Sequence, residues 1–113
     1  LIAALAPWLT PSDPVDTLTG RRLLVIHGEA DRITDPRVSR RYAEQAAAVA
    51  ESVSWVGIRG EKHAMMRKPQ LWHDLVTGYV LGALLGVPTV GTGRKVSANL
   101  VEKALAGQQR IVV

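Results

Sequence analysis

Two short apolar runs frame the middle of the chain, with an amphipathic stretch between them. The runs cover residues 23–26 and 53–58, and apolar residues between them recur at spacings of three and four up to about Ser52. The pair Asp35-Pro36 begins that stretch with an N-cap residue followed by a first-turn proline. Short continuous apolar runs are typical of strands buried on both faces of a parallel sheet. The pattern therefore predicts a strand–helix–strand unit.

The flanking segments have weaker patterns. Residues 7–22 hold three prolines, two aspartates and a glycine, which predicts a connecting loop without a helix. From Pro69 to about Gly86 an apolar pair recurs every four residues, which predicts a helix that closes the sheet. Residues 94–107 form a weak helical pattern, with Gly107 as its expected cap, and the last three residues fit either a strand or a frayed end.

Together these elements predict one domain of the α/β class. A chain of 113 residues with 47% hydrophobic residues can bury a single core. We divide it into a proline-rich connecting segment (1–22), a strand–helix–strand unit with a closing helix (23–86) and a weakly helical basic tail (87–113). Because two strands are too few for a stable sheet, we expect a partner or a second copy to cover an exposed sheet edge.

Charge and composition exclude several classes of function. The net charge is +4, and residues 1–86 contribute only ten basic against nine acidic side chains. Without a basic run interleaved with aromatic residues, nucleic-acid binding is not expected. The absence of cysteine excludes disulfides and thiolate metal sites. Residues 75–93 are uncharged, but glycines and Pro88 interrupt them, so no membrane span is expected.

The start of the chain bears on location and completeness. The first residue is Leu1 rather than methionine, and no charged region precedes the apolar residues 1–9. This is unlike a secretory signal, so we expect a cytoplasmic protein. We also expect the chain to be part of a longer one, because the candidate site described next is incomplete.

Candidate chemistry lies in the loops that follow the two predicted strands. Asp31 follows the first strand and His63 follows the second. Because parallel strands end at the same sheet edge, we expect these two side chains to lie close together. A carboxylate beside an imidazole fixes the imidazole tautomer and stabilises the imidazolium formed when the ring accepts a proton. Asp31 and His63 are therefore the candidate catalytic residues.

Other polar residues have simpler interpretations. Asp35 competes with Asp31 as the acid, but its place before a proline favours a helix cap. His27 ends an apolar strand and is predicted to be a hydrogen-bonded structural residue, whereas His73 is predicted to be solvated. A zinc site formed by His27, Asp31 and His63 lacks the usual ligand spacing, so no metal is expected. The GTGRK segment at 91–95 does not satisfy the Walker pattern.

Two segments carry a resemblance to a known family. The sequences LLVIHGEADRITDP, with GxxD at residues 28–31, and WVGIRGEKHAMMRKP, with GxxH at residues 60–63, resemble the acid and histidine segments of the α/β-hydrolase family. They occur in that family's order, over about residues 15–86. The resemblance implies that Asp31 is the triad acid, that His63 is the general base, and that residues 69–86 form the closing helix. It implies no cofactor.

The chain departs from that family in its nucleophile. No GxSxG sequence occurs, and the serines, at positions 12, 39, 52, 54 and 97, lie in other contexts. We therefore expect the C-terminal portion of a serine hydrolase, inactive alone, whose intact form hydrolyses a small ester-like substrate. Two alternatives stay open: a non-catalytic α/β domain that docks onto a partner, and epoxide or haloalkane hydrolysis with an aspartate nucleophile.

Overall fold

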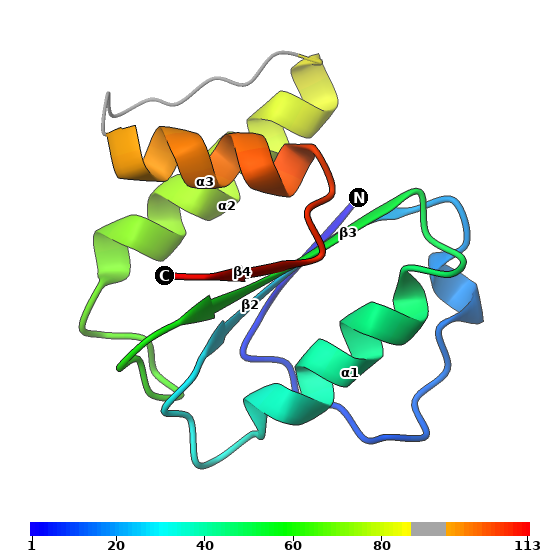
Figure 1. The fold of residues 1–113 in the computed structure, drawn as a ribbon, viewed down its shortest axis with the longest axis horizontal. Helices are drawn as coiled ribbons and strands as arrows, with labels where there is room; N and C mark the ends of the chain where they lie inside the picture. Colours follow the sequence, from blue (N-terminus) through cyan, green and yellow to red (C-terminus); the bar gives the residue numbers. More distant parts are fainter. Residues whose placement is uncertain (87–94) are drawn as a thin grey trace.

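The protein forms a parallel β-sheet with helices on both faces, and this confirms the predicted α/β class (Figure 1). A computed structural model describes residues 1–86 and 95–113. The strands β1 (Ile2–Leu5), β2 (Arg22–Gly28), β3 (Ser52–Ile58) and β4 (Arg110–Val112) lie in the order β1-β2-β3-β4, and all pairs are parallel. Helix α1 covers one face, and helices α2 and α3 cover the other.

The two central strands are buried on both faces, as their apolar runs predict. Alternate side chains of β2 and β3 pack toward α2 and α3, among them Ile26 and Val56. The intervening ones, among them Val25 and Trp55, pack toward α1. Pairing with β3 continues to Gly28 of β2. Strand β2 is therefore longer than the predicted run of residues 23–26, and it ends immediately before the loop that carries Asp31.

The predicted connecting segment contains more structure than its prolines indicate. Residues Ile2–Leu5 form β1, which pairs with β2, and Asp16–Leu18 form the 3-10 helix η1. The sequence predicts a loop without a helix over residues 7–22, and η1 is a single 3-10 turn inside it, whereas β1 lies before that range, where no strand is predicted. Four residues are too few to show a periodicity, so pairing with β2 decides the conformation of β1. A single 3-10 turn is short enough to fit between Pro14 and Gly20.

Helix α1 (Pro36–Ala46) starts where predicted and ends about six residues earlier. Asp35 is its N-cap and accepts the Arg37 backbone N–H at 2.8 Å, as predicted. The buried positions are Ser39, Ala43 and Ala46. The sequence pattern indicates a face of five residues, of which Ala46 is buried and Tyr42 and Ala50 pack against the same core, whereas Val38 is half-buried and Val49 is exposed. Ser39 faces inward because its hydroxyl accepts the buried Trp55 Nε1–H at 2.9 Å.

Helix α2 (Pro69–Leu85) has the predicted bounds, and Gly86 caps it at a φ of 72°. Leu75 and Tyr79 pack in the same core as β2 and β3, so α2 is a helix packed on the sheet, as predicted. Its Gly78 lies against α3 (Lys95–Leu105), where an added Cβ would come within 2.6 Å of Val101. No helix in the described part of the chain is long and apolar enough to span a membrane.

The C-terminal residues complete the sheet. Gly107, at a φ of 78°, follows α3, and β4 then pairs with β3. The last residues therefore form a strand rather than a frayed end. Residues 87–94, which include most of the GTGRK segment, lie outside the described residues.

Candidate active site

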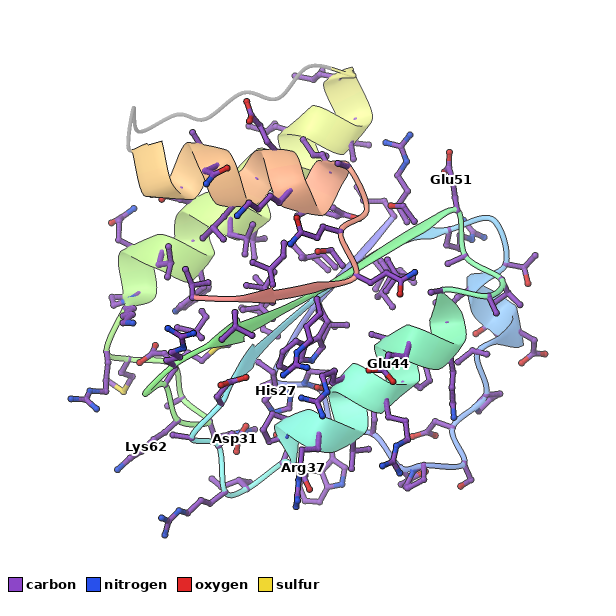
Figure 2. All side chains as sticks on the ribbon, viewed as in Figure 1. His27, Asp31, Arg37, Glu44, Glu51 and Lys62 are labelled. Atoms are coloured by element: carbon purple, nitrogen blue, oxygen red, sulfur yellow. The ribbon has the colours of Figure 1, made fainter. Side chains whose placement is uncertain are left out.

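Asp31 and His63 are in direct contact. The carboxylate Oδ2 of Asp31 accepts a hydrogen bond from Nδ1 of His63 at 2.9 Å. Asp31 lies in the loop after β2 and His63 in the loop after β3, and both strands end at this edge of the sheet. Figure 2 shows Asp31 and Lys62, the residue before His63, on these neighbouring loops. The expected approach of the carboxylate to the imidazole is confirmed.

Gly28 allows the two loops to approach each other. A Cβ atom at this position would overlap the Glu61 carbonyl oxygen, and it would lie 2.7 Å from the Glu61 carbonyl carbon and 2.9 Å from the Lys62 carbonyl oxygen. The Ala30 N–H donates to the Glu61 carbonyl at 3.0 Å. The glycine of GxxD is therefore required by backbone contact between the loops.

Glu61 anchors the loop that carries His63 through hydrogen bonds to the backbone. Its side chain is fully buried, and its two carboxylate oxygens accept the backbone N–H groups of Arg67 at 2.9 Å and Lys68 at 3.1 Å. These bonds fasten the start of α2 to the residue two positions before His63. Sequence reasoning missed this role, because nothing in the pattern distinguishes a buried glutamate from a solvated one in this loop.

The Asp31 carboxylate is saturated with hydrogen-bond donors. Oδ1 accepts the backbone N–H groups of Ile33 and Thr34 at 2.8 and 2.9 Å. Oδ2 accepts from the Thr34 hydroxyl at 2.7 Å and from His27 Nε2 at 3.0 Å, in addition to His63. Burial favours the neutral acid, but the bonds from Thr34, His63 and Ile33 outweigh it and hold the pKa of Asp31 well below its usual range. Asp31 is therefore an anion over the whole physiological pH range.

His27 extends this network into the core. The side chain is fully buried and, with Nε2 donating to Asp31, its Nδ1 lies 2.8 Å from the Ser39 hydroxyl. That hydroxyl also accepts Trp55 Nε1–H. The structural role predicted for His27 is confirmed, but its contact with the candidate acid was missed. Its spacing of four residues from Asp31 was the available signal, because the strand end and the following turn bring the two side chains together.

The second nitrogen of His63 is available for chemistry. Nε2 has no hydrogen-bond partner among the described residues, and 38% of the side chain is exposed. The ring lines an open pocket of about 480 Å³ together with Ala30, Arg32, Ile33, Lys62 and Ala64. An ionised acid on Nδ1 and an open Nε2 are what a general base needs.

The other candidate residues make no direct contact with Asp31 or His63 among the described residues. Asp35 pairs with Arg37 at 3.0 Å on the surface, and the ring of exposed His73 lies tilted against that of Trp72, with 4.1 Å between the ring centroids. Ser39, Ser54 and Ser97 bond His27, the Gln108 carbonyl and Asp74 respectively. Within the described ranges, no group of three or more histidines and carboxylates could hold a metal ion.

The chain was also compared with known proteins. No protein-family model, no curated protein and no solved structure gives a significant match. Function is therefore inferred from the site itself.

The low pKa of Asp31 predicts acid sensitivity. A carboxyl whose pKa is lower in the folded than in the unfolded state stabilises the fold fully above its unfolded pKa of about 4. This stabilisation is lost as the pH falls from there toward the folded pKa. We expect the free energy of unfolding, measured by urea titration, to fall with acid in the wild type and to fall less steeply in Asp31→Asn. The exposed Asp16→Asn variant is the control, and an equal slope in Asp31→Asn and the wild type would exclude this contribution.

Proposed function

We propose that this chain supplies the acid and the general base of a Ser-His-Asp hydrolase site, in the manner of the α/β-hydrolase family that its two loops resemble. The observation that carries the proposal is the 2.9 Å contact between ionised Asp31 and Nδ1 of His63, whose side chain lines an open pocket. A substantially buried carboxylate paired with an imidazole at the carboxyl edge of a parallel sheet is typical of catalytic sites.

The mechanism follows from the two nitrogens of His63. With Nδ1–H directed at Asp31, Nε2 accepts the proton of an attacking serine hydroxyl, and Asp31 stabilises the resulting imidazolium. His63 then returns the proton to the leaving alcohol of an ester-like substrate. The serine comes from a polypeptide segment outside these 113 residues, since the hydroxyls of Ser39, Ser54 and Ser97 bond other groups. Of the two remaining serines, Ser12 bonds Thr10 in the loop before β2, and Ser52 begins β3 at the end of the strand opposite to His63.

Fluorophosphonate labelling tests this function. The probe reacts with an activated serine, so we expect a labelled serine in the native protein, purified with whatever polypeptide accompanies the chain. We expect His63→Ala to abolish labelling because no base then accepts the serine proton. His73→Ala, which alters an exposed histidine on α2, is the matched control.

Labelling, combined with a search for other covalent intermediates and a binding assay, decides between the hydrolase proposal and its two alternatives. Labelling that persists at full rate in His63→Ala would contradict the proposal. Absence of labelling together with a covalent ester on an aspartate would favour epoxide or haloalkane hydrolysis. Absence of any covalent intermediate, with full binding to a partner in Asp31→Asn, would favour a docking domain.

A further inference from the structure

The rim of the candidate site carries positive charge that is not neutralised by ion pairs within the described residues. Five basic residues lie in the loops after β2 and β3, and none of them takes part in an ion pair there: Arg32, Arg59, Lys62, Arg67 and Lys68. Within residues 1–86 and 95–113, the five side chains make one hydrogen bond, a long one from Arg67 to the Gly60 carbonyl at 3.5 Å. These cations are therefore available to an incoming ligand.

Three acidic residues of the same loops, Glu29, Asp31 and Asp35, line a separate hollow that shares Arg32 and Ile33 with the pocket beside His63, and none of the three lines that pocket itself. Asp31 and Glu61 are buried and saturated by hydrogen bonds from the protein. Glu29 lies over β3, where its Oε1 is 2.9 Å from the position of a Cβ on Gly57. Asp35 is paired with Arg37.

The pocket combines this charge with an apolar wall. Ala30, Ile33 and Ala64 line it, and Arg32 and Lys62 are its only permanently charged lining residues. Its volume of about 480 Å³ is sufficient for a small organic ligand. A second hollow, of about 380 Å³, lies on the same loop region and is lined by Gly60 and three cations, Arg59, Arg67 and Lys68.

We infer that the pocket beside His63 binds an acyl substrate that carries a negatively charged group. This inference rests on the proposed function. The apolar residues contact the acyl chain near His63, and Arg32 and Lys62 attract the anionic group. Clustered charges of one sign also raise the local concentration of oppositely charged ligands.

A matched pair of ligands tests the charge requirement on the chain itself. Monoethyl succinate and ethyl succinamate differ only in a carboxylate that replaces a carboxamide. We expect the carboxylate to bind about tenfold more tightly at low ionic strength, measured by NMR shifts of the Ala30 and Ala64 methyl groups. We expect this preference to shrink in about 0.5 M salt, because screening weakens exposed charge pairs. Equal affinity for both ligands would overturn the inference.

Charge-removing variants assign the preference to the pocket. We expect Arg32→Gln and Lys62→Gln each to reduce the ratio of affinities for the carboxylate and carboxamide ligands about threefold. We expect the double variant to bind both ligands equally. Arg21→Gln removes an exposed arginine before β2, at the opposite end of the strands, and is the matched control. If both pocket variants bind like Arg21→Gln, the inference is wrong.

Failure of this inference and failure of the hydrolase proposal are distinguishable. Binding is measured without turnover, so loss of the carboxylate preference would remove the anionic substrate class and leave the Asp31–His63 pair intact. Conversely, failure of fluorophosphonate labelling would remove the hydrolase proposal while the measured preference still reported on an anion-binding pocket.

Discussion

Asp31→Asn is expected to lower turnover about 10⁴-fold in the assembled hydrolase, the scale seen when a catalytic imidazole loses its orienting carboxylate. Asparagine has nearly the same shape but carries no charge to stabilise imidazolium, and its amide can donate to Nδ1 and reverse the tautomer of His63. The measurement is kcat with an activated ester, made on the chain together with the polypeptide that supplies the serine.

Asp35→Asn is the matched control for this variant. It removes a carboxylate four residues away that caps α1 and pairs with Arg37 on the surface. We expect kcat to stay within about twofold of the wild type and the free energy of unfolding to change by less than about 1 kcal/mol, because asparagine caps a helix about as well as aspartate and the lost pair with Arg37 is exposed. If Asp35→Asn lowered turnover and Asp31→Asn did not, the acid would have been wrongly assigned.

The second large effect is expected for Gly28→Ala. The added methyl would overlap the backbone of Glu61 and Lys62, which cannot move away as a flexible side chain could. We expect a loss of about 3 kcal/mol in the free energy of unfolding, within the range for inserting a carbon into close-packed structure. Separation of the loops should also break the bond from His63 to Asp31. Urea denaturation measures the first effect, and NMR of the His63 ring measures the second.

Gly20→Ala provides the comparison. Gly20 has a φ of 71°, and a Cβ added there would meet no atom within 4 Å, so alanine meets only the backbone strain of about 1 kcal/mol. Its distance from the loops after β2 and β3 predicts no change in the His63 ring signals. Equal losses of stability in both variants, with His63 unaffected in both, would contradict the close-approach role of Gly28.

The elements that sequence predicts well are those that local pattern determines. β3 and α2 have continuous or periodic apolar residues over 7 and 17 positions, and α1 has an N-cap and a first-turn proline. The short strands β1 and β4 are not distinguished by pattern, because three or four residues adopt the extended form through pairing with a neighbouring strand. Tertiary contact likewise sets the end of α1 and its buried face.

One part of the candidate site could likewise be predicted from the sequence, and another part could not. The meeting of Asp31 and His63 follows from parallel strand direction alone, so it could be expected before the structure. The contributions of His27 and Glu61 could not, because each depends on burial that only the packed fold produces. The sequence does not distinguish a buried histidine or glutamate from a solvated one, because the residues that bury it lie on other segments of the chain.

The ring nitrogens of His63 provide the most direct test of the proposed acid–base pair. For the neutral ring, ¹⁵N NMR of the 113-residue chain distinguishes a protonated Nδ1 from a protonated Nε2. We expect a proton on Nδ1, hydrogen-bonded to Asp31, and an unprotonated Nε2, with this state lost in Asp31→Asn. A proton on Nε2 in the wild type, or a tautomer that does not respond to Asp31→Asn, would contradict the pairing.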